Sequence, residues 1–117
     1  MAQAIVYFNH DKLDKAKSIL LQISARFPDF AGAPQSLAAL ALCYYKEGDC
    51  SNTIKYYLKL IEQYPDHRLV PEAYFHLGVC YEKIGMPKES NEAYNKILED
   101  YPATVFGEHT KKIFAGE

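Results

Sequence analysis

The sequence predicts an all-α fold in which three helical hairpins stack on one another. The first observation is a period, because three aromatic-proline pairs, Phe27-Pro28, Tyr64-Pro65 and Tyr101-Pro102, follow one another at intervals of 37 residues. The second is similarity between intervals: residues 34–70 and 71–107 share 11 identical positions out of 37. Typical residue frequencies would give about two or three identities by chance. Periods of this length are typical of proteins built from short helical repeats.

Each interval contains two segments in which apolar residues recur at helical spacing. In the third interval, the first helix is expected to begin at Pro71, since a proline in the first turn loses no hydrogen bond. It is expected to end at Gly85, because glycine readily adopts the left-handed backbone found at helix ends. The second helix is expected to run from Pro87 to Tyr101, where the following proline disfavours further helix.

The other two intervals follow the same plan with differences at the N-terminal end. Helices are expected over 34–47 and 50–64, with the turn at Gly48. The first interval has Asp11 where the others have glycine, and aspartate tolerates left-handed backbone and can also cap the following helix. Only residues 1–8 remain of the first helix of that interval.

The chain is therefore expected to form a single domain, and its C-terminal segment is open to two interpretations. Apolar residues at Phe106, Ile113 and Phe114 predict a helix over about residues 104–115. This helix could cap the last hairpin, or it could be the opening of a fourth unit in a chain cut from a longer repeat array. The three expected units span about residues 1–33, 34–70 and 71–107 of the domain 1–117.

Small residues recur where the two helices of a hairpin are expected to face each other. Ala41 and Gly78 occupy equivalent places in the first helices, and Thr53 and Ser90 in the second helices. Helices that present small residues to each other can approach closely while larger side chains fill the grooves beside them. A single hairpin cannot bury both its faces, so stacking supplies the continuous core.

This pattern resembles the tetratricopeptide repeat. The family's motif places a large residue, Leu-Gly and Tyr in the first helix, followed by small, aromatic and Pro positions in the second. In the third unit these fall on Tyr74, Leu77-Gly78, Tyr81, Ser90, Tyr94 and Pro102; in the second on Leu37, Leu40-Ala41, Tyr44, Thr53, Tyr57 and Pro65; in the first on Ala4, Tyr7, Ala16, Leu20 and Pro28. The chain departs from the family in lacking its usual Trp and in having a period of 37 rather than 34. The resemblance implies a right-handed α-α superhelix that acts as a protein–protein interaction scaffold and not as an enzyme.

Composition excludes several other classes of function. The chain has 117 residues, a net charge of −2 and a pI near 6.1, so it has no basic surface of the kind that binds nucleic acid. It has no apolar run long enough to span a membrane and no recognisable signal peptide. An odd number of cysteines, three, fits a reducing compartment and predicts a cytoplasmic protein. The alternative is a bacterial periplasm or envelope, if the chain is a fragment that lacks its signal.

The sequence contains none of the catalytic or phosphate-binding motifs that we sought, and no cofactor or metal is expected. Cys43 and Cys80 are interpreted as small buried residues between helices. Cys50 lies at a helix start, where a thiolate would be somewhat stabilised. Glu72, His76 and Cys80 share one helix face and could ligate zinc, but an ordinary edge between surface and core is the preferred interpretation.

The resemblance implies that a partner binds to the concave surface lined by the first helices. Aromatic and apolar residues beside polar ones are typical of binding surfaces. The competing interpretation is that these aromatics pack on neighbouring hairpins or on the C-terminal helix. The inward positions are Ile5, Phe8 and Asn9 in the first unit, Gln35, Ala38, Leu42, Tyr45 and Lys46 in the second, and Glu72, Phe75, His76, Val79, Glu82 and Lys83 in the third.

The expected partner is a protein or peptide with an apolar or amphipathic segment, docking as a helix in a groove. Some family members hold a chaperone's C-terminal carboxylate with a Lys-Asn-Asn-Lys-Arg set. That clamp is absent, so no such tail is expected to bind; its places hold Met1, Ile5, Leu42, Phe75 and Val79. A self-assembly module that forms homo-oligomers through its open ends is the alternative function, and a metal or redox role is a third.

Overall fold

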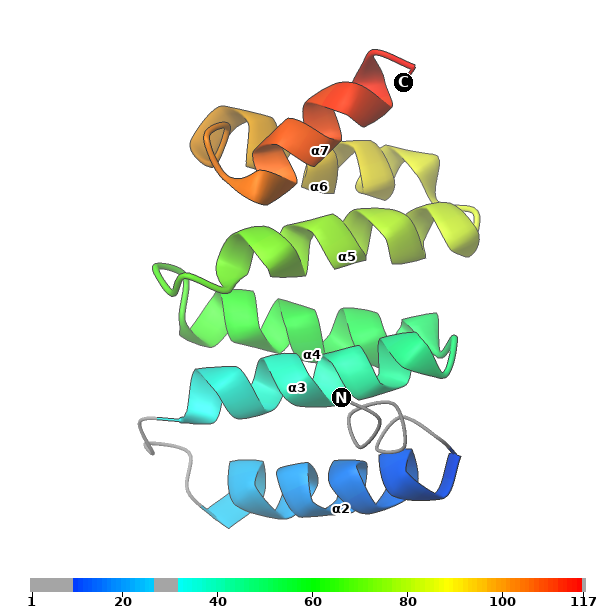
Figure 1. Ribbon diagram of the computed structural model, residues 1–117, viewed down its shortest axis with the longest axis vertical. Helices are drawn as coiled ribbons and strands as arrows, with labels where there is room; N and C mark the ends of the chain where they lie inside the picture. The colour runs from blue at the N-terminus through cyan, green and yellow to red at the C-terminus, as the bar shows by residue number, and fades with distance from the viewer. Residues whose placement is uncertain (1–9, 27–31, 117) are drawn as a thin grey trace.

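The computed structural model describes residues 10–26 and 32–116, and these form α-helices connected by short turns. Within the described ranges there is no strand, which confirms the predicted all-α class of stacked helical hairpins. The helices follow one another along the long axis of the molecule in chain order (Figure 1). Their bounds are α2 (His10–Arg26), α3 (Ala33–Lys46), α4 (Cys50–Gln63), α5 (Val70–Lys83), α6 (Pro87–Asp100) and α7 (Val105–Phe114).

Two parts of the expected pattern lie outside the described residues. These are the helix expected over residues 1–8, with Ala4 and Tyr7, and the first aromatic-proline pair, Phe27-Pro28. None of the helices described is both long and apolar enough to cross a membrane.

The 37-residue period sets the bounds of the two central hairpins. Moving α3 by 37 residues gives the bounds of α5, and moving α4 gives those of α6. The prolines Pro34 and Pro71 stand in the first turns of α3 and α5, as the sequence predicted. Each hairpin turns at a glycine with left-handed backbone, φ +78° at Gly48 and φ +80° at Gly85, where a side chain would be strained.

The first unit departs from this plan, and the expectation for Asp11 was wrong. α2 begins at His10, so Asp11 lies inside the helix instead of forming the turn before it. No residue other than glycine has a positive φ in the part of the chain that the structure describes. A left-handed turn costs more free energy at aspartate than at glycine because aspartate has a Cβ, so a helical backbone is favoured at this position.

The two helices of a hairpin approach closely at the small residues. A Cβ built on Gly78 of α5 would lie 2.6 Å from the ring of Tyr94 on α6. Beside it, the Ser90 hydroxyl donates a 2.8 Å hydrogen bond to the Gly78 carbonyl, which ties the helices together inside the core. In the preceding hairpin, Ala41 and Thr53 are completely buried. The predicted role of these small positions is thus borne out in the packing.

The core runs through the hairpins as one cluster. α3 packs against α2 and α4, and α5 packs against α4 and α6. The cluster joins side chains from α3, α4, α5 and α6. Its fully buried large members include Tyr57, Leu40, Leu60 and Leu77. Burying a side chain of this size stabilises the fold by about 1.5–3 kcal/mol.

The C-terminal helix α7 packs on α5 and α6. It begins at a capping threonine: Thr104 Oγ1 accepts a 3.0 Å hydrogen bond from the Gly107 amide and donates one of 2.7 Å to the Tyr101 carbonyl. A Cβ on Gly107 would lie 2.3 Å from that same carbonyl oxygen, so the first turn of α7 lies against the end of α6. Thr110, one turn later, is fully buried.

The close approach at Gly78 yields a stability prediction. Replacing Gly78 with valine would force Tyr94, which is only 3% exposed, out of its place against α5. We expect the free energy of unfolding to fall by about 1–3 kcal/mol or more, as for other overpacked cores. Urea denaturation followed by circular dichroism measures it.

Asn95→Val is the control, because Asn95 is exposed on α6 and because asparagine and valine have similar helix propensities. A Gly78→Val protein as stable as this control would mean that the hairpin does not depend on the glycine.

Candidate partner-binding face

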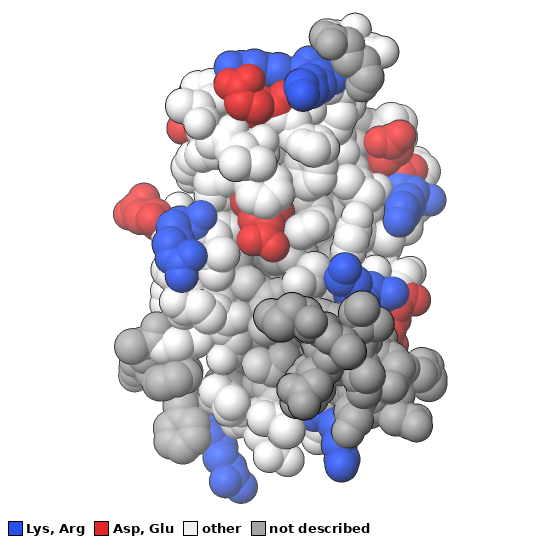
Figure 2. Space-filling view, viewed as in Figure 1, with Lys and Arg blue, Asp and Glu red and all other residues white. Residues whose placement is uncertain are grey.

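The candidate site is the face formed by the first helices α3 and α5 and closed at one end by α7, which we call the binding face. Among the described residues, uncharged side chains cover most of this side of the molecule, and the charges lie mainly along its edges, apart from an acidic group near its middle (Figure 2). Charges gathered mainly at the rim are also typical of protein interfaces.

The structure places the predicted residues at different depths. Among those on α3 and α5, Ala38 alone is buried: it is only 9% exposed and belongs to the core. Ile5, Phe8 and Asn9 lie outside the described residues. The half-buried positions are Leu42, Tyr45, Glu72, Phe75, His76 and Val79, and the exposed ones are Gln35, Lys46, Glu82 and Lys83.

An aromatic cluster joins the two central hairpins beneath this face. His76 of α5 lies between two tyrosines, its ring 4.6 Å from that of Tyr45 on α3 and 5.3 Å from that of Tyr57 on α4. The Lys83 ammonium lies 5.5 Å from the centre of the Tyr45 ring, within cation–π range. The cluster fixes the position of Tyr45 while leaving part of its ring accessible.

Polar groups in this cluster are buried without full hydrogen bonding. Within the described residues, neither the Tyr57 hydroxyl nor His76 Nδ1 has a hydrogen-bond partner. The nearest carboxylate oxygen, Glu72 Oε1, is 4.0 Å from His76 Nδ1, beyond hydrogen-bonding distance. Buried polar atoms without partners are costly to the folded state.

Burial controls the ionisation of this cluster. Desolvation, with a smaller contribution from the charge of Lys46, lowers the pKa of His76 to about 4, so the imidazole is neutral at pH 7. Desolvation raises the pKa of Glu72 above its usual value. For Tyr57, burial and then the charge of Glu72 raise the pKa far above the normal range. The centre of the face therefore suits an uncharged or hydrogen-bonding ligand group.

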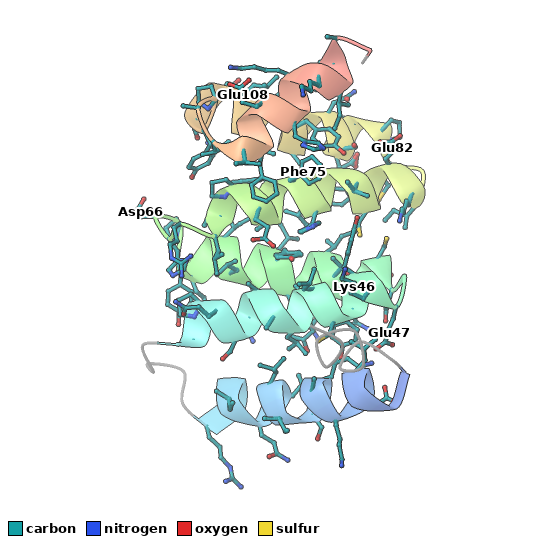
Figure 3. The ribbon with its side chains drawn as sticks, viewed as in Figure 1. Lys46, Glu47, Asp66, Phe75, Glu82 and Glu108 are labelled. Carbon is teal, nitrogen blue, oxygen red and sulfur yellow. The ribbon has the colours of Figure 1, made fainter. Side chains whose placement is uncertain are left out.

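One side of the face is covered by α7. Phe75 lies between α5 and α7 (Figure 3), with its ring 5.5 Å from those of Phe106 and His109. It also meets the Tyr94 ring edge-on at 5.9 Å. Phe75 therefore packs on the C-terminal helix, which was the alternative to an open binding position.

Phe106 and His109 are part of the site and were not among the predicted positions. The signal for His109 was present in the period, since it follows Gln35 and Glu72 at intervals of 37. Its segment could be a capping helix or the opening of a fourth unit, and His109 was not among the predicted inward positions. α7 therefore extends the face, because His109 occupies the position that Gln35 has on α3 and Glu72 has on α5.

The cysteines lie away from this face and inside the helical stack. Cys43 is 6% exposed and Cys80 is completely buried, in agreement with their interpretation as small core residues. Desolvation, and next a hydrogen bond with Cys50, raise the pKa of Cys80 to about 12, so its thiol is protonated at pH 7. Glu72, His76 and Cys80 do not converge: no group of three metal-ligating side chains occurs among the residues described.

Comparison with known proteins identifies the fold family. A tetratricopeptide repeat model matches residues 32–103, the two central hairpins and the start of the segment before α7. The chain belongs to the tetratricopeptide repeat family. The proposed resemblance is confirmed over most of the chain, and proteins of this family mediate protein–protein interactions. No curated protein matches the chain.

The buried His76 gives this tetratricopeptide repeat protein a predictable acid response. The folded state keeps His76 neutral down to about pH 4, whereas its ordinary pKa is 6.5. Unfolding therefore takes up a proton between these pH values, and stability falls as the pH is lowered through this window. We expect wild type to lose on the order of 2–3 kcal/mol relative to a His76→Phe variant between pH 7 and pH 4.

The measurement is urea denaturation of both proteins at several pH values. Glu72, whose pKa is raised, acts in the opposite direction because its folded form takes up a proton more readily than its unfolded form. Glu72→Gln is the control that removes this effect. Parallel pH profiles for wild type and His76→Phe would show that His76 is not held neutral by the fold.

Proposed function

We propose that the chain is a single scaffold domain, with units of about residues 1–33, 34–70 and 71–107, that binds a protein segment on its binding face. No catalytic role is part of the proposal, and the family supports this because its members are typically non-enzymatic scaffolds. The expected occupant is an apolar or amphipathic segment docked as a helix in the groove between first helices.

One observation carries this proposal: the half-exposed centre of the face covers buried polar groups that lack partners. Tyr45 offers an accessible aromatic surface, while His76 Nδ1 and the Tyr57 hydroxyl beneath it have no hydrogen-bond partner among the described residues. Partly exposed tyrosines held rigidly by neighbours are typical centres of binding energy. An entering side chain could bury the Tyr45 ring, and one that displaces this ring could reach the imidazole nitrogen buried beneath it.

The rim of the face gives the segment an orientation. Glu82 and Lys83 follow each other at the C-terminal end of α5 and are both exposed, and Lys46 is exposed at the end of α3. At the other end, Phe75 is covered by α7. The accessible apolar contact is therefore centred on Leu42, Tyr45 and Val79, with Lys46, Glu82 and Lys83 at one end.

The proposal is tested with peptides selected from a random library for binding to the wild-type chain. We expect Tyr45→Ala to weaken the binding of such peptides by about 2 kcal/mol or more, as at other interface hot spots. Isothermal titration calorimetry gives the affinities, and circular dichroism confirms that the variant is folded.

Ile19→Ala is the control, because Ile19 is an exposed apolar residue, 56% accessible, on α2. Selected peptides that bind Tyr45→Ala and Ile19→Ala equally well would place the site elsewhere on the molecule.

Self-assembly is a second candidate function, and the exposed end of α7 favours it. Ile113 and Phe114 are 41% and 45% exposed, large fractions for apolar residues on a packed helix. With Tyr94 they border a hollow of about 330 Å³ between α6 and α7. A second copy of the chain could cover this apolar end, as adjacent units cover each other within a repeat stack.

This second function predicts a concentration-dependent mass by light scattering. If copies associate through α7, Phe114→Lys should weaken the dimer by about tenfold or more, since burying a charge at an apolar contact is unfavourable. A chain that remains monomeric at high concentration would exclude self-assembly and leave the scaffold proposal untouched.

A further inference from the structure

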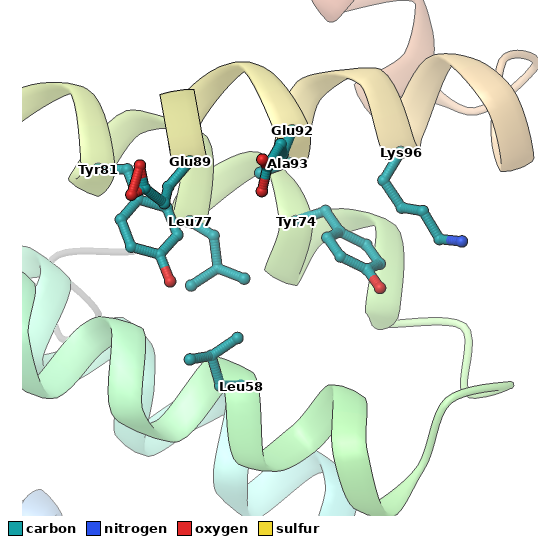
Figure 4. Close-up of a pocket in the computed structure, with 8 residues that line it drawn as sticks. All are labelled: Leu58, Tyr74, Leu77, Tyr81, Glu89, Glu92, Ala93 and Lys96. Atoms are coloured by element: carbon teal, nitrogen blue, oxygen red, sulfur yellow. The ribbon is translucent and has the colours of Figure 1, made fainter. Parts of the chain in front are cut away.

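A second hollow lies between α4, α5 and α6 and shares no residue with the binding face. It has a volume of about 230 Å³ and an apolar interior. Leu58 of α4 and Leu77 of α5 face each other across it, and Tyr74 and Tyr81 border it on α5 (Figure 4). Leu58 is 44% exposed, so this wall of the hollow is open to solvent.

The repeat period shows what is missing from this hollow. The equivalent place in the preceding unit is filled by Tyr56, which is 9% exposed and stacks on Tyr44 with ring centres 5.6 Å apart and planes 3° apart. Thirty-seven residues later, Ala93 replaces Tyr56, while Tyr81 retains the place of Tyr44. The hollow is therefore the space that a tyrosine ring occupies one unit earlier.

The rim of the hollow is also more acidic than the equivalent place in the preceding unit. In the preceding unit Lys55 places its ammonium 5.3 Å from the centre of the Tyr56 ring, and Asn52 lies nearby on the same helix. The equivalent residues of α6 are Glu92 and Glu89, both of which line the hollow.

The two glutamates are the charges left to meet a ligand. Neither has an ion-pair partner among the described residues. At the other end of the hollow Lys96 is held by Asp100 at 2.8 Å. The rim therefore presents unpaired negative charge beside an apolar interior.

We propose that this hollow binds a protein segment through one aromatic side chain flanked by lysine or arginine. The ring would enter between Leu58 and Leu77 and stack on Tyr81, as Tyr56 stacks on Tyr44. A cavity of about 150 Å³ is enough to bind benzene, so the space is adequate for a single ring. The flanking cations meet Glu89 and Glu92, which supply the orientation and the preference for a basic segment.

The test uses three blocked pentapeptides and the full chain labelled with nitrogen-15: Gly-Lys-Tyr-Lys-Gly, Gly-Glu-Tyr-Glu-Gly and Gly-Lys-Ala-Lys-Gly. The first should shift the backbone amide signals of Leu58, Tyr81 and Ala93 in a saturable manner. The second should bind several-fold more weakly, at least about threefold given the strength of exposed ion pairs. Absence of shifts at the hollow, or equal binding of the alanine peptide, would overturn the proposal.

Two kinds of variant separate a role of the ring from a role of the charges. Ala93→Tyr restores the residue found one unit earlier and should abolish binding while raising or preserving the melting temperature. The double variant Glu89→Gln, Glu92→Gln should keep the fold and lower the affinity for the lysine peptide by about threefold or more. Leu58→Arg, at an exposed position, should also prevent binding and remains informative if Ala93→Tyr does not fold. Unchanged affinity in Ala93→Tyr or Leu58→Arg would show that the ring does not bind here.

Discussion

The structure depends on the close approach of two helices at positions without a bulky side chain. At Gly78 a Cβ would lie 2.6 Å from the Tyr94 ring, and the Ser90 hydroxyl reaches the Gly78 carbonyl at 2.8 Å. This contact fixes the separation of α5 and α6, and so it decides which side chains fill the space beside them. Because Tyr94 is held against α5, its ring can also meet Phe75 and Phe114, and through them α7. The packing of α7, and the end of the binding face that it covers, therefore depend on this one approach.

The period carried enough information to predict most of the fold. Aromatic-proline pairs and turn glycines act through local backbone preferences that do not depend on the rest of the chain, so the helix ends near Gly48, Gly85 and Tyr101 were predictable. Asp11 was not, because the choice between a turn and an earlier helix start depends on what precedes it. The only signal in the sequence was the aspartate itself, which is compatible with a turn and with a helix start.

The candidate site was predictable in register but not in accessibility. The register identified the α3 and α5 positions that lie near one another, including Tyr45 and His76. Which of them stay accessible depends on the neighbouring helix, and a period contains no information about where the stack ends. Phe75 illustrates this, since α7 places Phe106 and His109 over its ring. The unsatisfied Nδ1 of His76 could likewise not be predicted, because a period does not show which polar groups come within hydrogen-bonding distance of it.

Differences between units are therefore as informative as the period itself. The period sets the backbone, so a substitution at an equivalent position changes the surface without changing the helices around it: α4 and α6 have equivalent bounds although Tyr56 in one is Ala93 in the other. The loss of the ring removes buried apolar contact, which costs stability unless another group fills the space. The position equivalent to Lys55 is Glu92, which leaves the space unfilled and gives the rim a negative charge. In this unit the unfilled space and the unpaired carboxylates lie at the same place, and a group that is both aromatic and cationic would satisfy both, which is the ground for the proposed site.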